Sequence, residues 1–230
     1  MIAVITSTIT PLASFSYFSP QDRLDQTIVT IEKLYEVGFK QVFLIDNSSQ
    51  DIKKHYLESK YPYLKVWHQE QYAFANKGLN EALLLLNNIH RLPENTSIFK
   101  ISGRYYPSNA FQLHPMAKET DFIGLGKNFN TRVPWLSTRA YFVKNKTILE
   151  EILVLSIEEM ISYSKGIHGI RSFGKAIKLI FLKKIGTSFQ LSLETAFGMI
   201  IRQKLNFKLV DKLNIEGFIA GSKHQDFITE

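Results

Sequence analysis

Two short segments of the chain combine residue types that bind anions. One follows the apolar run Ser97–Ile101 and reads Ser-Gly-Arg, and the other reads Asn-Lys-Gly and opens the leucine-rich segment before that run. Lysine and arginine bind phosphate oxygens through charge-assisted hydrogen bonds, and glycine lets a ligand or a helix approach the backbone closely. The alternative is that these side chains are merely solvated. The residues concerned are Asn76, Lys77, Gly78, Lys100, Ser102, Gly103 and Arg104.

The spacing of the two segments predicts that they meet at one edge of a parallel sheet. A strand ends near Trp67, a helix begins around Tyr72–Asn76 and ends before Pro93, and a second strand covers Ser97–Ile101. Such β-α-β crossovers build parallel sheets. Ligands of open parallel sheets lie beyond the carboxyl ends of the strands. We therefore expect both segments on one rim, beside a bound ligand.

The composition is that of a globular protein with an anionic partner. The chain has 230 residues, 45% of them hydrophobic, a formal net charge of +7 and no cysteine. The lack of cysteine excludes disulfides and thiolate metal sites and suits the cytoplasm. No apolar run reaches the roughly 18 residues of a membrane span, and Met1–Ile9 lacks the features of a signal peptide. The charge favours a nucleotide diphosphate, a membrane surface or nucleic acid.

Apolar runs alternate with amphipathic segments over residues 1–106 and predict a doubly wound α/β half-domain. A helix begins at Ser19–Pro20, as expected for a cap followed by a first-turn proline, and stops at Gly38. A polar helix ends at about Lys60. The expected strands are Ile2–Ser7, Gln41–Asp46, Leu64–Trp67 and Ser97–Ile101.

After Pro107 the pattern changes, and we treat 107–230 as the acceptor-side half of a single domain covering 1–230. Residues 126–137 form an expected acceptor or lid loop, and a short polar tail follows Gly217. The segment Ser172–Lys184 is basic and amphipathic, which suits either a helix lying on an anionic membrane or a surface helix packed on the core. The expected strands are Asp121–Leu125, Arg139–Val143 and, last in the chain, Phe207–Asp211; the expected helices are Asn145–Tyr163 and Leu191–Leu205.

Six segments, taken in order, resemble those of GT-A-fold glycosyltransferases, most closely the inverting, family-2-like members. They read ITSTITP, FLIDNSSQD, YAFANKGLNEAL, IFKISGRYYP, LSTRAYFV and LETAFGMIIRQKLNFKLV. The resemblance covers about residues 1–145 and the helix from Leu191. It implies a mostly parallel, twisted, GT-A-like sheet flanked by helices, with a helical C-terminal part.

The resemblance also implies roles for the nucleotide-binding half. Thr6 and Ser7 would line the base pocket, and Asp46 would contact the nucleoside. An aspartate before Asn47 also suits an Asx-turn or a helix cap, and both roles can hold together. Asn76, Lys77 and Gly78 match the Asn-x-Gly element of the family.

In the second half the resemblance assigns a general base. Glu194 would deprotonate the acceptor hydroxyl; the alternative is an acidic residue favoured by the helix dipole behind the cap Ser192. If Glu194 is not the base, Asp121 or Glu216 would be considered next. His224 in the tail would close over the diphosphate.

The metal site of the family is missing from the sequence. The turn that normally supplies two carboxylates to Mg²⁺ or Mn²⁺ reads Ile-Ser-Gly-Arg, and no Asp-x-Asp sequence occurs. Serine and glycine alone do not hold a dication. We therefore expect no cofactor, and a dependence on Mg²⁺ or Mn²⁺ that is weak or absent unless a phosphate and His224 supply other ligands. Arg104, Lys100 or Lys77 would neutralise the leaving group instead.

Together these features predict a cytoplasmic glycosyltransferase for polysaccharide synthesis, with a nucleotide-sugar donor and a glycan or lipid-linked acceptor. Inversion is expected because Glu194 supplies a base and no second carboxylate is placed as a nucleophile. Contact with the inner membrane face would run through 172–184. A nucleotidyltransferase shares the sheet but usually has a glycine-rich basic loop after its first strand, which TSTITPLASFS lacks. A non-catalytic binding module is the other alternative, although the scattered basic residues argue against nucleic acid.

Overall fold

The structure is a computed structural model that describes residues 1–11, 17–50, 52, 54–72, 74, 76–114, 116–165, 190–219 and 226–230. The amphipathic segment Ser172–Lys184 and His224 lie outside the described residues. Within the described ranges, no helix has the length and apolar character needed to cross a membrane.

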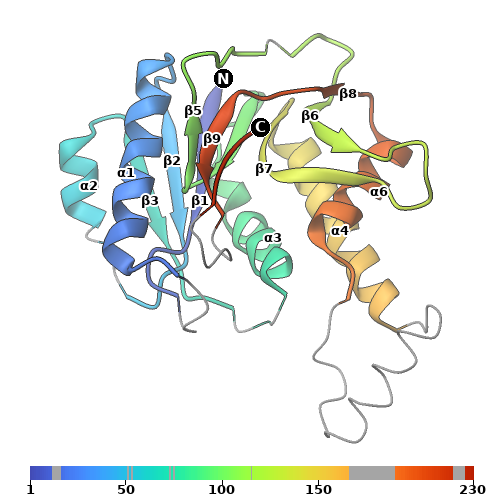
Figure 1. The fold of residues 1–230 in the computed structure, drawn as a ribbon, viewed down its shortest axis with the longest axis horizontal. Helices are drawn as coiled ribbons and strands as arrows, with labels where there is room; N and C mark the ends of the chain where they lie inside the picture. The colour runs from blue at the N-terminus through green and yellow to red at the C-terminus, as the bar shows by residue number, and fades with distance from the viewer. Residues whose placement is uncertain are drawn as a thin grey trace, which may run out of the picture.

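A seven-stranded, mostly parallel sheet forms the centre of the molecule (Figure 1). Its strands are β1 (Ile2–Ser7), β2 (Val42–Asp46), β3 (Leu64–His68), β4 (Ile98–Ser102), β6 (Phe122–Lys127), β7 (Trp135–Val143) and β8 (Phe207–Val210). They lie in the order β3-β2-β1-β4-β7-β6-β8. Strands β1 to β4 are parallel, β7 is antiparallel to β4 and β6, and β8 is parallel to β6. The predicted α/β class is confirmed.

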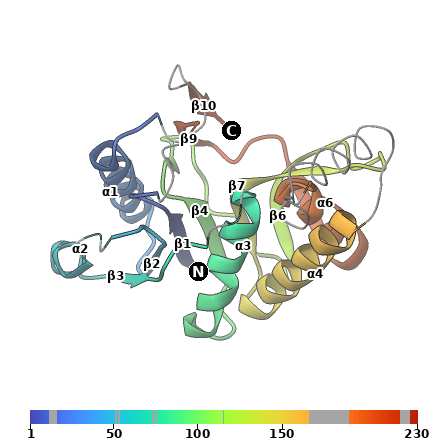
Figure 2. The same ribbon diagram turned by 90° about the horizontal axis from the view of Figure 1, so that it is seen from below.

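Helices cover both faces of the sheet (Figure 2). They are α1 (Pro20–Glu36), α2 (Lys54–Lys60), α3 (Lys77–Asn88), the 3₁₀ helix η1 (Ile89–Arg91), α4 (Lys146–Lys165) and α6 (Leu193–Lys204). Side chains of β1 alternate between two cores, as the pleat requires. Val4 packs in the core that contains Leu79 of α3, whereas Ile5 packs in the core that contains Ile31 of α1. The helices α4 and α6 share the α3 side.

Local sequence fixes where the site-bearing helices begin. Ser19 caps α1 in a capping box with Asp22, and a proline occupies the first turn. Asn76 caps α3 through Leu79 N–H at 3.1 Å, and Ser192 caps α6. These caps confirm the predicted helix starts, because each side-chain oxygen satisfies a backbone N–H that the helix leaves unpaired.

The C-terminal part differs from the prediction in two places. The tail after Gly217 is not merely polar: β9 (Ile215–Phe218) and β10 (Phe227–Thr229) form a small antiparallel sheet with β5 (Tyr105–Pro107). The loop predicted over 126–137 is also too long, because β6 and β7 extend into it and leave only residues 128–134 between them. Short strands of mixed polarity carry a weak alternation signal, which explains both errors.

Candidate functional site

The candidate site lies where β1, β2 and β4 end. Thr6 is paired in register with Ser102, and Ser7 with Asp46, so the residues that end these three strands meet at one edge. The turn after β4 is held on β1, since Gly103 N–H donates to the Thr6 carbonyl at 2.8 Å. A Cβ at Gly103 would lie 3.0 Å from Thr27 Oγ1 of α1. Glycine therefore serves close packing between this turn and α1.

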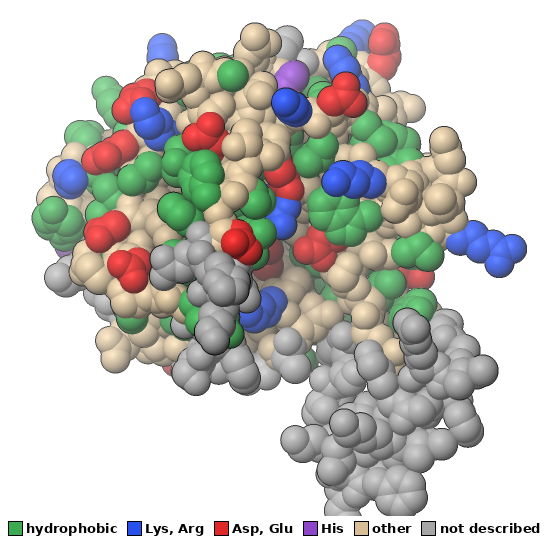
Figure 3. All heavy atoms as spheres, in the orientation of Figure 1, with side chains coloured by type: hydrophobic (Ala, Val, Ile, Leu, Met, Phe, Trp, Pro, Cys, Tyr) green, Lys and Arg blue, Asp and Glu red, His purple; other side chains and the backbone are tan. Residues whose placement is uncertain are grey.

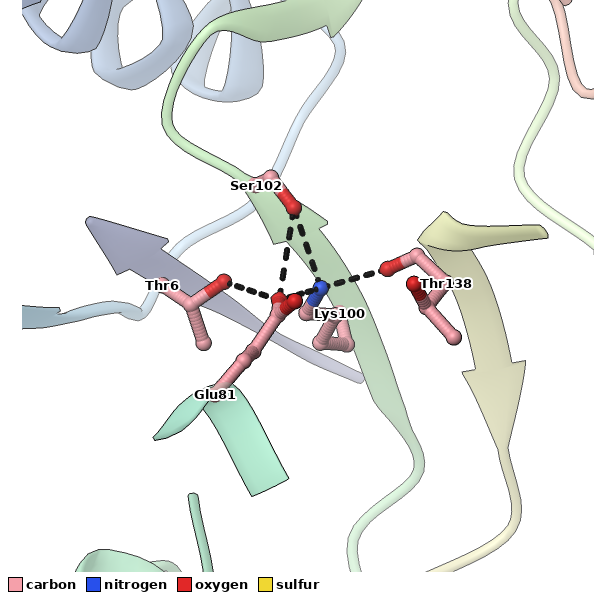
Figure 4. Close-up of polar contacts among 5 residues, drawn as sticks. All are labelled: Thr6, Glu81, Lys100, Ser102 and Thr138. Atoms are coloured by element: carbon pink, nitrogen blue, oxygen red, sulfur yellow. Dashed lines mark hydrogen bonds and ion pairs between the residues drawn. The ribbon is translucent and has the colours of Figure 1, made fainter. Parts of the chain in front are cut away.

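A buried ion pair lies directly behind this rim (Figure 4). The Lys100 side chain is only 1% exposed, and its ammonium group is paired with the Glu81 carboxylate. It also donates to the Thr138 carbonyl at 2.5 Å and to Ser102 Oγ at 3.1 Å. The expectation that Lys100 lies on the rim is therefore wrong: position 100 points into the α3 side of the sheet, and all three of its N–H donors are already used.

Glu81 is a functional candidate that the sequence analysis missed. It comes from the second turn of α3, is 24% exposed, and also accepts a 2.8 Å hydrogen bond from Thr6 Oγ1. Burial favours the neutral form of the carboxyl, but the charge and hydrogen bond of Lys100, together with Thr6, hold the pKa of Glu81 below its ordinary value. A lysine inside a strand was the available signal, because a buried ammonium group needs a carboxylate partner.

Three basic side chains from three different elements form a cation cluster at the rim: Arg23 of α1, Lys77 of α3 and Arg104 of the turn after β4. Burial lowers the pKa of Arg23 to about 10, and the Arg104 charge adds to this effect. Burial also lowers the pKa of Lys77, as do the charges of Arg104 and Arg23. The three cations are therefore close enough to repel one another.

The cation cluster has unsatisfied donors. Burial lowers the pKa of Arg104, with Tyr105 and Glu81 opposing the change and Arg139 adding to it. Its Nη1 is buried with no hydrogen-bond partner in the described part of the chain, and the same holds for Nε of Arg23. A buried, unpaired guanidinium N–H is costly unless an acceptor is supplied. This arrangement fits a bound anion.

Arg139 of β7 extends the positive charge but has its own carboxylate. It forms an ion pair with Glu230, whose side chain is 12% exposed and also accepts from Ser137 Oγ at 2.8 Å. Arg139 and Arg104 both lie over the ring of Tyr105, at 5.7 and 6.0 Å from its centroid. Both guanidinium groups therefore contact the same aromatic ring.

Asp46 holds the turn after β2 in place. Its side chain is 0% exposed, and its two carboxylate oxygens accept from Ile9 N–H at 3.2 Å and from Ser48 N–H at 2.8 Å. Burial raises the pKa of Asp46 against the effect of these hydrogen bonds. The turn-stabilising alternative is confirmed, and the nucleoside contact stays a prediction.

The start of α3 packs against the start of α6. Asn76 Nδ2 donates to the Leu191 carbonyl at 3.0 Å. A Cβ at Gly78 would lie only 2.6 Å from Leu193 Cβ, so this glycine serves helix packing. Glu194 follows Leu193 in the first turn of α6, the helix whose start packs against the start of α3.

The other predicted polar residues divide between the rim and distant positions. Ser7 contacts Thr27 of α1 at 3.4 Å. Asp121 is wrong as a base, because it precedes β6 at the opposite edge of the sheet and pairs with Lys144. Glu216 lies in β9 of the small sheet, opposite Tyr106 of β5.

The turn after β4 does not fit a divalent metal. Ser102, Gly103 and Arg104 supply no carboxylate, and a guanidinium repels a dication. No group of three histidine, cysteine, aspartate or glutamate residues in the described ranges has a metal-binding arrangement. On the molecular face of Figure 3, basic and acidic side chains meet in a hollow near the centre.

Known proteins share the fold of this chain. No protein-family model matches the sequence, and comparison with curated proteins finds no significant relative. A putative glucose-1-phosphate thymidylyltransferase from Bacillus anthracis, solved with sucrose, has a TM-score of 0.52 at 9% identity, covering 97% of this chain and 91% of its own. An active-site mutant of LgtC has a TM-score of 0.51 at 4% identity, covering 91% of this chain and 72% of its own.

A nucleoside-diphosphate-sugar pyrophosphorylase from Vibrio cholerae RC9 has a TM-score of 0.50 at 10% identity, covering 98% of this chain and 97% of its own. LgtC is elsewhere described as a galactosyltransferase in complex with donor and acceptor sugar analogues. At these identities the likeness establishes the fold alone. The GT-A-like fold implied by the sequence is confirmed, and it is one that glycosyltransferases and nucleotidyltransferases share.

Proposed function

We propose that this chain is a glycosyltransferase that uses a nucleotide-sugar donor and a glycan or lipid-linked acceptor. The observation that carries the proposal is the cation cluster of Arg23, Lys77 and Arg104 at the carboxyl edge of the sheet, with a buried Arg104 donor that has no partner in the described part of the chain. Ligands of such sheets bind at this edge. A nucleotide-sugar diphosphate supplies acceptor oxygens and negative charge to match.

In the proposed reaction, the cation cluster binds the leaving diphosphate. Guanidinium groups form paired hydrogen bonds with phosphate oxygens, and Lys77 adds a point charge. The three groups come from α1, α3 and the turn after β4, so the fold holds them in place before the reaction. Because the turn does not fit a dication, these residues would carry the neutralisation themselves, and the reaction would not require Mg²⁺ or Mn²⁺.

Glu194 is the proposed general base. It would accept the proton of the acceptor hydroxyl while that oxygen attacks the anomeric carbon and the bond to the diphosphate breaks. Support comes from its position at the start of α6, which packs against the start of α3 that carries Lys77. Attack from the side opposite the leaving group inverts the anomeric carbon. Synthesis of surface polysaccharide in the cytoplasm is the proposed setting.

A nucleotidyltransferase is the second candidate, because two of the structures that share the fold have that activity by description. It would join a nucleoside triphosphate to a sugar phosphate and release pyrophosphate. The loop after β1 argues against it in this chain, since residues 8–18 contain neither glycine nor a basic residue.

Product analysis separates the two candidates. The protein would be incubated with a panel of nucleotide sugars, and separately with nucleoside triphosphates plus sugar 1-phosphates, each with and without EDTA. A thermal-shift screen of the same panel identifies ligands, because a ligand that binds only the native state raises its stability. We expect slow release of nucleoside diphosphate from one nucleotide sugar. Pyrophosphate release from a triphosphate would support the second candidate, and no binding of any nucleotide would refute both.

A further inference from the structure

The buried Lys100–Glu81 pair takes no direct part in the proposed reaction, yet it binds two hydroxyl side chains at the rim. Thr6 and Ser102 form the last pair between β1 and β4 and lie opposite each other. Both hydroxyls contact the pair (Figure 4). These contacts determine the hydrogen-bonding capacity that each hydroxyl offers to a ligand.

The contacts give the two hydroxyls opposite polarity, by which we mean that one can donate a hydrogen bond to a ligand and the other can only accept one. An ammonium group has three donors and no acceptor, and Lys100 directs one of them at Ser102 Oγ, 3.1 Å away. Ser102 therefore accepts from Lys100 and donates its own proton only weakly, to Glu81 Oε1, so that this proton can turn to a closer acceptor. Its distance to Glu81 Oε1 is 3.4 Å, a long hydrogen bond to an oxygen that already accepts from both Lys100 and Thr6.

Thr6 has the reverse arrangement. Its hydroxyl donates to Glu81 Oε1 at 2.8 Å, so its only proton is used and only lone pairs remain. Thr6 is 5% exposed, so only a small part of the residue is open to a ligand. With its proton used, the hydroxyl can only accept hydrogen bonds there.

We propose that Lys100 and Glu81 are positioning residues that set this polarity, so that Ser102 donates to a phosphate oxygen of the ligand and Thr6 accepts only from N–H or O–H groups. The inference rests on the proposed function for its ligand class, a phosphate anion of a nucleotide sugar. It adds a reason for the buried charges: neither touches the ligand, but together they decide which rim hydroxyl recognises the anion.

The test measures the affinity of inorganic pyrophosphate by calorimetry in a double-mutant cycle. We expect Ser102→Ala to weaken binding about tenfold, the effect of losing a hydrogen bond to a charged group. Thr6→Val removes a hydroxyl from the same cluster, but its proton is already used, so its effect should stay below about twofold. Glu81→Gln combined with Lys100→Met keeps the approximate shape of the pair and removes both charges together, which avoids leaving one buried charge unpaired.

In that neutral background Lys100 no longer orients Ser102, so Ser102→Ala should weaken binding by less than about threefold, a non-additive result. A purely structural pair predicts additive effects instead. The ion pair of Lys33 and Glu36 in α1, whose charged atoms lie 2.6 Å apart, is the control. Glu36→Gln combined with Lys33→Met should leave the affinity for pyrophosphate unchanged. The proposal would be overturned by any of three results: additive effects on affinity in the cycle, a loss of affinity in Thr6→Val equal to that in Ser102→Ala, or no binding of pyrophosphate by the wild type. Pyrophosphate binding with this cycle but no turnover of any nucleotide sugar would refute only the proposed function.

Discussion

Substitution of Arg104 by alanine should change stability and ligand binding in opposite directions. In the ligand-free protein Nη1 of this guanidinium is buried and has no partner among the described residues, and the charge lowers the pKa of Arg23 and Lys77. Removing it relieves repulsion and an unsatisfied donor. We therefore expect the ligand-free variant to melt at the same temperature as the wild type or slightly higher.

Ligand binding should weaken in the same variant. A hydrogen bond to a charged group contributes about 1.5–3 kcal/mol, which corresponds to a loss of about 10- to 150-fold in affinity for a nucleoside diphosphate. Thermal unfolding without ligand and calorimetry with UDP and GDP measure the two effects. Arg104→Lys is the matched control, which keeps the charge but not the planar fork and should bind with intermediate affinity. Wild-type affinity, or a loss of stability above about 1 kcal/mol, would assign Arg104 to packing and refute the reasoning.

The remaining predictions concern the base, the metal and pH. Glu194→Gln should leave donor affinity unchanged and lower turnover about 10²-fold, and turnover above about a tenth of the wild-type rate would place the base elsewhere. Donor binding should survive EDTA; complete loss that Mn²⁺ restores would reveal metal ligands. Because burial and two neighbouring arginines lower the pKa of Lys77, diphosphate affinity should be full below that pKa and should fall as the pH rises through it, at a lower pH than for an ordinary lysine. Lys77→Arg, whose guanidinium keeps its proton, should move that fall to higher pH; an unchanged pH profile would contradict this role.

The sequence was sufficient for the sheet and for most helices because their signals are local. The β-branched run of β1, the capping serine and proline of α1, and the leucine stripe of α3 each determine an element without reference to distant residues. The small sheet of β5, β9 and β10 was missed, since its strands have three or four residues and depend on pairing across long sequence distances.

The candidate site was predicted only in part, for a related reason. Arg104 and Lys77 were identified because each stands in a turn or helix start beside a glycine. Arg23 was missed because an arginine inside α1 looks like a surface residue until the packing of α1 against the Gly103 turn buries it. Glu81 was missed because its partner, Lys100, lies in another element, and only the pairing of the two explains either one.

The cation cluster of Arg23, Lys77 and Arg104 offers a reason why the turn after β4 carries no carboxylates. In the proposed reaction the diphosphate gains negative charge as its bond to the sugar breaks, and something must stabilise that charge. Arg23, Lys77 and Arg104 repel one another while the site is empty, and each has a pKa lowered by burial. A ligand whose charge increases during the reaction relieves this repulsion more in the transition state than in the bound donor, which is the condition for accelerating a reaction. A carboxylate pair at Ser102 and Arg104 would weaken this effect, so the absence of an Asp-x-Asp sequence and the presence of these three cations form one consistent arrangement.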